Sequence, residues 1–300
     1  MFVQLADGRI ALLTARHVVF PAVLSGEVTM SHAGRGQSFV PSAIKVDSRL
    51  DLALLVVPSD VDVGSYLCWA EWAAENKPAV EKGMAIIACG VPGELKGVPD
   101  LKTRIIPRVV FFQYYTGVLD PLDQYGLIVC DIDKGAPLLP KTFRGMSGGP
   151  AFSVKRQLVG INVSERLTQS VDGRLYVLPR HRFGSLTTPF VPKAGSPSDY
   201  VMCNEGRFSM MAESMDAPGE SFFVNARVEY FCSQNDPEHP MGRMGRIVCL
   251  SLSRERGDLR LPINVESVFY YDGDDEAEKI RAAREEFFFL LQDTRYRLVD

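Results

Sequence analysis

The chain has 300 residues, of which 46% are hydrophobic and 23% are charged, and its formal net charge is −4. This composition is typical of a globular protein, and the weak acidity gives no reason to expect binding to nucleic acid or to an anionic membrane. No stretch approaches the roughly 20 apolar residues of a membrane span, and no basic N-terminal segment precedes an apolar core, so neither a membrane helix nor a signal peptide is expected.

The first predicted element is a hairpin over residues 2–19. Phe2–Leu5 and the apolar segment Ile10–Val19 flank a turn signal at Ala6–Gly8, and the second strand is expected to end on His17. Of the four histidines, only His17 lies in an apolar segment. A histidine at the end of a buried strand can be held rigidly and still reach a cleft. His17 is therefore a candidate general base, although a core histidine satisfied by a backbone carbonyl is the alternative.

A carboxylate opens the next strongly apolar segment. Asp51 directly precedes six apolar residues, Leu52–Val57. A buried carboxylate is costly unless it is paired or hydrogen-bonded, and a histidine N–H is a natural partner. Asp47 is the competitor, but its immediate neighbours look solvated. The sequence favours Asp51 as the partner of His17, with a role as a strand-end cap as the alternative.

The middle of the chain changes character twice. Residues 69–79 interrupt the strand pattern and predict a short helical insertion. A strand and a turn are expected over residues 83–92. The segment Gly93–Asp100 has the composition of a linker, and it separates a first β region, residues 1 to about 93, from a second, about 105 to 190.

Glycines then crowd a single serine in the segment Gly145–Pro150. A serine hydroxyl is a poor nucleophile unless a base stands beside it and backbone N–H groups face the oxygen that becomes negative. Glycines on both sides let the backbone adopt turn conformations that aim such N–H groups together. Ser147 is therefore a candidate nucleophile, although an ordinary glycine-rich turn would have the same composition.

The chain order His17, Asp51, Ser147 is that of chymotrypsin-like proteases, and it differs from the orders found in α/β-hydrolases and subtilisins. Three segments resemble the trypsin-like peptidases of the HtrA type: Thr14–Val19, Asp51–Leu55 and Gly145–Pro150.

The resemblance covers roughly residues 1–190 and implies a fold. That fold is mainly β, a chymotrypsin-like pair of six-stranded β-barrels within a protease domain over residues 1–191. Barrel one would span about 1–93, closed by the strand in residues 83–92, and barrel two about 105–190.

The resemblance also implies roles for individual residues. Ser147 attacks a peptide carbonyl, His17 carries its proton and Asp51 orients the imidazole, while the backbone N–H groups of Gly145 and Ser147 form the oxyanion hole. The strand Leu158–Val163 would line the substrate cleft. The expected substrate-binding residues are Lys141, Arg144, Asn162, Val163 and Ser164.

Met146 distinguishes this chain from secreted trypsin relatives. Those enzymes carry an aspartate before the serine, which pairs with a freshly cut N-terminus, and methionine cannot form that ion pair. Activation by release of a new N-terminus is therefore not expected.

The cysteines indicate the redox compartment. The six cysteines are scattered without a Cys-x-x-Cys pair or a histidine at ligand spacing, so no zinc site, no other metal and no cofactor is expected. Cys89 and Cys130 lie in apolar strand-like segments, where free thiols are usual. A reducing, cytoplasmic location fits this pattern best.

A second linker, Pro192–Asp199, precedes a predicted α+β module over residues 200–300. Strands are expected at 222–231, 246–252 and 263–271, and a helix at 276–292, opened by Asp275 with Glu278 at capping-box spacing. Five residues share one face of this helix, apolar except for Arg284: Ala277, Ile280, Arg284, Phe287 and Leu291. The cluster Phe287–Leu291 is expected to belong to the core rather than to a binding surface. The module lacks the carboxylate-binding loop of the PDZ domains that HtrA-type chains often carry here.

The sequence thus predicts a serine endopeptidase acting on protein or peptide substrates, with no nucleic acid or membrane partner. Residues 200–300 would regulate it or recruit an activating partner. Two alternatives stay open. One is a catalytically silent trypsin-like scaffold that binds peptides; the other is an adaptor in which the protease is latent.

Overall fold

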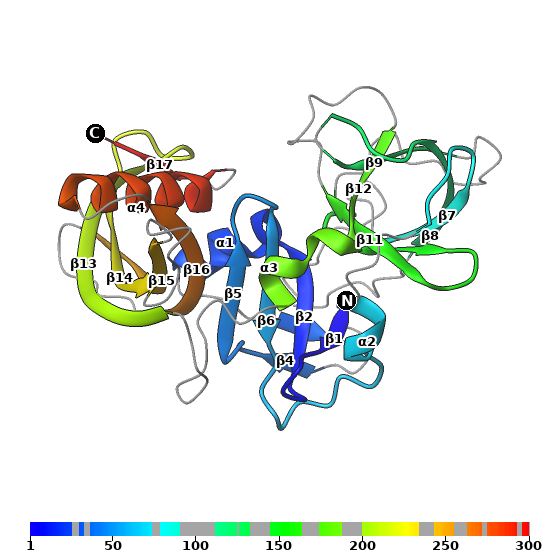
Figure 1. Ribbon diagram of the computed structural model, residues 1–300, viewed down its shortest axis with the longest axis horizontal. Coiled ribbons are helices and arrows are strands. Elements are labelled where there is room, and N and C mark those ends of the chain that lie inside the picture. Colours follow the sequence, from blue (N-terminus) through cyan, green and yellow to red (C-terminus); the bar gives the residue numbers. More distant parts are fainter. Residues whose placement is uncertain are drawn as a thin grey trace, which may run out of the picture. The chain divides into compact units, whose positions relative to one another are not determined.

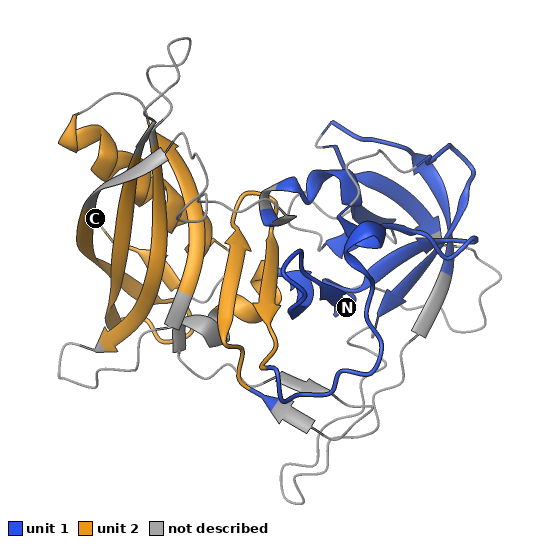
Figure 2. Cartoon of the chain, turned by 60° about the horizontal axis from the view of Figure 1, so that its bottom comes forward, with its two compact units in different colours: residues 1–15, 31–39, 59–187 blue, residues 16–30, 40–58, 188–300 orange. Residues whose placement is uncertain are grey.

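The computed structural model describes residues 1–25, 30–32, 37–73, 79–90, 112–124, 126–132, 145–163, 174–187, 200–233, 243–254, 263–271, 275–292 and 296–299. The chain divides into two compact units (Figure 2). Unit 1 comprises residues 1–15, 31–39 and 59–187, and unit 2 comprises residues 16–30, 40–58 and 188–300. The linkers predicted at 93–100 and 192–199 lie outside the described residues.

Unit 1 contains a closed barrel of six antiparallel strands, which confirms one of the two predicted barrels. Its strands are β7 (Ala85–Gly90), β8 (Phe112–Asp120), β9 (Ile128–Ile132), β10 (Pro150–Ser153), β11 (Leu158–Val163) and β12 (Arg174–Pro179). They pair in the order β10-β11-β12-β9-β8-β7, and β7 closes the barrel onto β10. The interior is apolar and includes Ile86, Val118, Cys130 and Val177.

The predicted place of β7 is wrong. It was expected to close the first barrel, but it pairs with β8 on one side and with β10 on the other, so it belongs to the barrel that carries Ser147. The pattern of residues 85–90 alone could not decide between two neighbouring barrels, because an apolar strand suits either interior.

The rest of unit 1 begins with a hairpin, β1 (Phe2–Gln4) and β2 (Ile10–Ala15), in which Phe2 is opposite Leu12. The predicted helical insertion is confirmed as α2 (Trp69–Trp72), and the buried Trp72 donates from Nε1 to the carbonyl of Gln4 at 2.6 Å. Two short helical turns follow β12, namely η3 (Arg180–Arg182) and α3 (Gly184–Thr187). A two-stranded sheet pairs β3 (Met30–His32) with β4 (Gln37–Phe39).

The predicted hairpin does not reach residue 19. Strand β2 ends at Ala15, and a helix, α1 (Arg16–Ser25), begins at once. His17 therefore lies in the first turn of a helix rather than at the end of a strand.

Unit 2 is built on a curved sheet with α4 (Glu276–Leu291) lying against one face (Figure 1). The strands run in the order β6 (Leu52–Val56), β5 (Ala43–Asp47), β16 (Ile263–Tyr271), β15 (Arg243–Arg254), β14 (Ser221–Ser233), β13 (Tyr200–Ser214) and β17 (Tyr296–Leu298). Neighbours are antiparallel except β5 and β16, which are parallel and place Val265 opposite Ile44.

This pairing changes the predicted architecture. Two closed barrels were expected, but the edge of β5 is occupied by β16, and in the part of the chain described here β5 and β6 belong to an open sheet. The strands of residues 200–300 therefore do not form a sheet of their own. The predicted strands at 222–231, 246–252 and 263–271 and the helix at 276–292 are confirmed.

The predicted core cluster at the end of α4 is confirmed in part. Phe287, Leu290 and Leu291 are buried, but Phe288 is exposed, and Ala277, Ile280 and Arg284 also face solvent. The buried positions include Ala282, Ala283, Leu290 and, against expectation, Glu286. Asp275 caps the helix as predicted, by accepting a hydrogen bond from the N–H of Ala277. Among the described residues, no helix is both long and apolar enough to cross a membrane.

Candidate functional site

The predicted acid, Asp51, lies in the turn between β5 and β6. The turn is held by Asp47, whose Oδ1 accepts from the N–H of Leu50 at 2.9 Å. Asp51 itself has a φ of +56°, a left-handed conformation that is unusual for a residue with a side chain. Such strain persists only where the surroundings fix it, and it is concentrated at functional sites.

Asp51 and His17 form a tight pair within unit 2. His17 Nδ1 lies 2.6 Å from Asp51 Oδ2, and the two side chains are 17% and 11% exposed. An ionised carboxylate can only accept, so the pair fixes the proton on Nδ1 and leaves Nε2 as the basic nitrogen.

The same aspartate explains why His17 is helical. The N–H of His17 donates to Asp51 Oδ1 at 2.9 Å, and the N–H of Arg16 donates to the carbonyl of Asp51 at 2.8 Å. The first N–H groups of a helix have no partner inside it, and a negative charge is favourable at that end. Asp51 thus provides a tertiary cap for α1, so the backbone of His17 is held together with its ring.

The predicted nucleophile, Ser147, lies half-buried in the loop before β10 of unit 1. The following residue, Gly148, has a φ of +81°, and a Cβ placed there would lie 2.1 Å from Thr14 Oγ1 and 2.9 Å from the nitrogen of Ala15. Only glycine fits both the backbone conformation and this close approach. The loop of Ser147 therefore packs directly against the end of β2.

Two buried side chains anchor the loop on either side. Met146 is 1% exposed and packs in the barrel interior against Gly90. Asn162 is also 1% exposed: its N–H donates to the carbonyl of Gly149, its carbonyl accepts from Gly148, and its Nδ2 donates to the carbonyl of Cys89 at 2.9 Å. Met146 therefore has a structural role in place of the aspartate of secreted relatives.

Gly145 and Ser147 were expected to provide the oxyanion hole. Gly145 has a φ of +91° and is exposed at the start of the loop. Within the described ranges, neither of these N–H groups donates to a protein acceptor, whereas Gly148 and Gly149 do. Among the described residues, the N–H groups of Gly145 and Ser147 therefore have no protein acceptor that would compete with a ligand.

The predicted substrate-binding residues are placed only in part. Lys141, Arg144 and Ser164 lie outside the described residues. Asn162 cannot pair with an added peptide strand, because its N–H and carbonyl already bond to residues 148 and 149. Val163 is 4% exposed on β11, an inner strand of the barrel paired with β12. Asn162 therefore supports the nucleophile loop. Contact of Asn162 and Val163 with a substrate stays a prediction.

Two buried charged residues near the His17–Asp51 pair were not predicted. Arg16 is 1% exposed, with Nε 3.6 Å from Asp51 Oδ1 and one terminal nitrogen donating to the carbonyl of Leu290 at 2.6 Å. Glu286 is 1% exposed, and Ser48 and Ser267 donate to its Oε1. Arg16 could have been suspected, because a charged residue inside an apolar segment needs a partner. Glu286 has no comparable signal, since its partners are distant in sequence.

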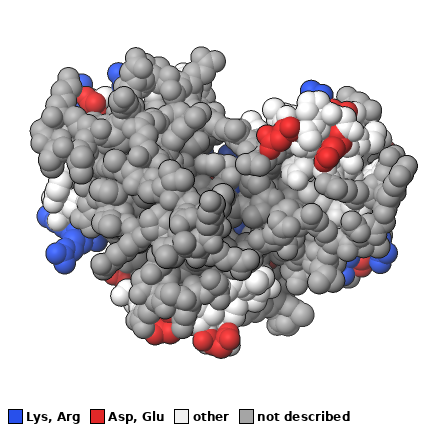
Figure 3. Space-filling model, turned by 180° about the vertical axis from the view of Figure 1, so that it is seen from behind, with Lys and Arg blue, Asp and Glu red and all other residues white. Residues whose placement is uncertain are grey.

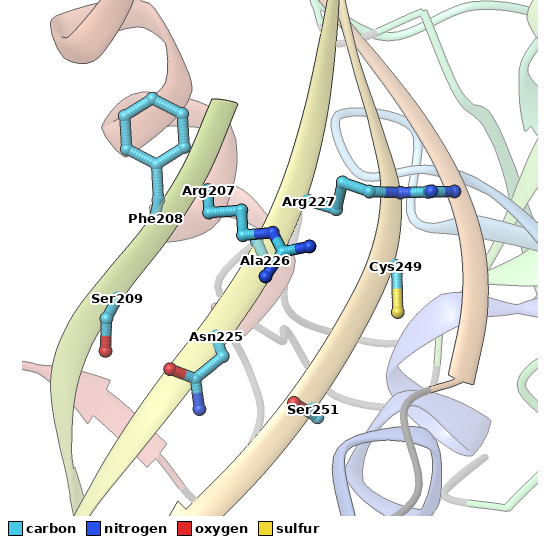
Figure 4. Close-up of a pocket in the computed structure, with 8 residues that line it drawn as sticks. All are labelled: Arg207, Phe208, Ser209, Asn225, Ala226, Arg227, Cys249 and Ser251. Carbon is cyan, nitrogen blue, oxygen red and sulfur yellow. The ribbon is translucent and has the colours of Figure 1, made fainter. Parts of the chain in front are cut away.

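A separate hollow of about 600 Å³ opens on the sheet face of unit 2 away from α4 (Figure 4). Arg207 and Arg227 are opposite each other on β13 and β14, and the lining also includes Ser209, Asn225, Cys249 and Ser251. Burial raises the pKa of the Cys249 thiol, with Arg227 opposing the effect, so a reactive thiolate is not favoured here. The lining combines two guanidinium groups with hydroxyl and amide groups, and none of its eight residues is a general base that could activate Ser209, Ser251 or Cys249.

The described residues contain no group of three or more His, Cys, Asp or Glu side chains that could hold a metal ion. On the face shown in Figure 3, the charged side chains of described residues lie in small separate groups of both signs. Cys68, Cys89, Cys130 and Cys249 are free thiols.

Comparison with protein families gives one match: residues 2–161 match the model of the trypsin-like peptidase domain. The matched range contains His17, Asp51 and Ser147, and it ends one residue before Asn162. No curated protein gives a significant match.

Comparison with solved structures gives matches of low sequence identity, of which three are described. The Rv3671c protease of M. tuberculosis in its active form is 16% identical, with a TM-score of 0.38, over 59% of this chain and 67% of that one. A serine endoprotease from Yersinia pestis is 16% identical, with a TM-score of 0.37, over 59% of this chain and 52% of its own. The MamO protease domain of Magnetospirillum magneticum is 15% identical, with a TM-score of 0.40, over 62% and 86%. The chain thus spans about half the length of the Yersinia protein.

Proposed function

The chain belongs to the trypsin-like peptidase family, and from this premise we propose that it is a serine endopeptidase that uses Ser147, His17 and Asp51. The observation that carries the proposal is the 2.6 Å contact between His17 Nδ1 and Asp51 Oδ2. This contact fixes the tautomer that a general base in this reaction requires, with Nε2 free to take a proton.

The reaction follows from these roles. Ser147 Oγ attacks the carbonyl carbon of the substrate, and its proton passes to His17 Nε2. The C–N bond of the tetrahedral intermediate then breaks, and the departing amine takes the proton from His17. The remaining acyl group is an ester on Ser147. Water repeats the sequence on the ester, giving a free carboxylic acid and the original serine. Asp51 stabilises the imidazolium at each transfer.

The loop of Ser147 supports the same function from unit 1. Its Gly148 packs on Thr14 and Ala15, and Ala15 is two residues before His17 in the sequence.

The available N–H groups of Gly145 and Ser147 are proposed as the oxyanion hole. They would donate to the carbonyl oxygen as it becomes negative, and loss of one such donor typically lowers kcat by about 10²–10³-fold.

A second candidate function is a catalytically silent scaffold that binds peptides. The hollow lined by Arg207 and Arg227 favours it, because two guanidinium groups lie opposite each other on neighbouring strands, with Glu205 Oε1 3.8 Å from Arg227 Nε. An acidic segment or a terminal carboxylate has the matching chemistry. The same hollow could recruit substrates to an active enzyme.

A fluorophosphonate probe tests the proposal, because it reacts only with a serine activated by its base. The full chain should be labelled on Ser147, as located by peptide mass mapping. Ser147→Ala should abolish labelling and peptide hydrolysis. Ser65→Ala, which removes an exposed serine of unit 1 outside the hollow, is the matched control and should change neither. A folded parent chain that neither labels nor hydrolyses peptides would instead support the silent scaffold.

A further inference from the structure

We propose that Arg16 and Glu286 are positioning residues through which helix α4 holds the His17–Asp51 pair in its working geometry. The inference rests on the proposed function, because it assigns to the C-terminal residues a part in building the same active site. It is carried by four contacts within unit 2, none of which involves the substrate.

The first contact is the parallel pairing of β16 with β5, which joins Val265 to Ile44 and Glu266 to Lys45. Strand β5 leads directly into the turn that holds Asp51. The C-terminal sheet therefore fixes the backbone on which the acid is mounted, and removing it would expose the edge of β5. A large deletion would confuse loss of folding with loss of positioning, so single substitutions are the sharper test.

The second contact reaches the turn itself. Ser48, three residues before Asp51, donates from Oγ to Glu286 Oε1 at 2.7 Å, and Ser267 of β16 donates to the same oxygen. Ser48 and Ser267 are 6% and 1% exposed. Buried polar groups are costly when unpaired, so this three-residue cluster ties α4, β16 and the turn to one another.

The third and fourth contacts belong to Arg16. Its guanidinium donates to the carbonyl of Leu290, one of the last carbonyls of α4, where the helix dipole is negative. The same side chain places Nε 3.6 Å from Asp51 Oδ1. A buried arginine requires such compensation, and here it is divided between the end of α4 and the proposed catalytic acid. Arg16 also precedes His17 directly, so its position determines where α1 begins.

The consequence is a chain of contacts from α4 to the imidazole. If α4 shifts, Arg16 loses its hydrogen bond to the carbonyl of Leu290, and Ser48 loses its hydrogen bond to Glu286. The left-handed turn at Asp51 then loses its contacts with α4. A misplacement of about 1 Å at a catalytic group can cost roughly 10²-fold in rate. The C-terminal residues would therefore act on kcat without contacting the substrate.

The test uses the full chain carrying Arg16→Lys, Arg16→Met, Glu286→Ala or Glu286→Gln. Arg16→Met and Glu286→Ala should lower kcat about 10–100-fold with KM nearly unchanged, because orientation is lost and substrate contacts are not. The kcat of Arg16→Lys should lie between that of these variants and that of the parent, since lysine keeps the positive charge but cannot donate in two directions as a guanidinium does. Glu286→Gln keeps the acceptor for both serines and should stay near the parent. Arg281→Ala, an exposed change on α4 itself, is the control and should leave kcat unchanged.

A second readout separates this inference from the proposed function. The proton shared by His17 Nδ1 and Asp51 should give a downfield NMR resonance that is absent from His17→Gln. It should weaken in Arg16→Met and Glu286→Ala and persist in Arg281→Ala. If the resonance changes in this way although the parent hydrolyses nothing, the positioning stands and the proposed function fails. If folded Arg16→Met and Glu286→Ala retain both the resonance and the parent kcat, the inference is wrong.

Discussion

Asp51 binds His17 twice, once through the ring and once through the backbone. Oδ2 lies 2.6 Å from Nδ1, while Oδ1 accepts from the N–H of the same residue at 2.9 Å. One carboxylate thus orients the imidazole and caps the helix that carries it. Changes to Asp51 should consequently affect activity and stability together.

Asp51→Asn is expected to lower kcat by about 10⁴-fold, because an amide can donate to Nδ1 and thereby stabilise the wrong tautomer. Stability should fall by about 1 kcal/mol with the loss of the charged cap of α1. Steady-state kinetics and urea unfolding measure the two effects. Asp47→Asn is the matched control, because an amide oxygen can still accept from Leu50. Equal losses in both variants would show that the turn, and not the His17 pair, is what matters.

Glu286 predicts how stability depends on pH. Burial raises its pKa above the ordinary value of 4.5, although Ser267, Ser48 and the nearby Arg49 oppose the shift and Asp47 adds to it. The folded chain therefore retains this proton more strongly than the unfolded chain. Its contribution to stability is fully present below pH 4.5 and is lost as the pH rises through the raised value.

Glu286→Gln removes this titration while keeping the acceptor oxygen. Relative to the parent, the variant should gain stability from about pH 4.5 upward and then level off. Urea unfolding of both proteins between pH 4 and pH 8 measures the difference. Glu286→Ala should be less stable than the parent at every pH, because it leaves Ser48 and Ser267 unpaired. A pH-independent difference between parent and Glu286→Gln would mean that Glu286 titrates alike in the folded and unfolded chains.

Lys45, at the pairing of β5 with β16, predicts a second dependence of stability on pH. Burial lowers its pKa from 10.5 to about 8, and the facing Glu266 partly offsets the shift. Between these values the unfolded chain binds more protons than the folded one, so stability should rise as the pH rises from about 8 to 10.5. Lys45→Met should abolish this rise in urea unfolding, whereas the exposed Lys82→Met should leave it in place. If the stability of Lys45→Met still rises over this pH range, a group other than Lys45 causes the rise.

Sequence patterns predicted the elements whose signal is local. The apolar segment of β11 and the capped, periodic segment of α4 lie where they were expected. Strand β13 was missed although its residues alternate, with Phe208, Met210 and Ala212 on the more buried side. Glycine, serine and methionine in that strand weaken the β propensity, so the alternation alone was not convincing.

What the sequence could not provide were long-range partners. The helical start at His17 depends on Asp51, 34 residues away, which supplies the cap that the local sequence lacks. The burial of Glu286 depends on Ser48, 238 residues away. Likewise, β5 joins β16 in place of a barrel neighbour. No periodicity within β5 indicates which strand will occupy its edge.

Gly148 provides the most direct test of the nucleophile loop. Gly148→Ala would put a Cβ 2.1 Å from Thr14 Oγ1 at a φ of +81°, so the variant combines backbone strain with a collision. Gly8→Ala is a matched control, because Gly8 has a φ of +86° but nothing within 4 Å of an added Cβ. The control should lose about 1–2 kcal/mol of stability from the left-handed backbone alone and keep its fluorophosphonate labelling. Gly148→Ala should lose more stability and nearly all labelling, because the loop must move away from the end of β2. Comparable labelling in the two folded variants would show that the packing of Gly148 on β2 is not needed for an active Ser147.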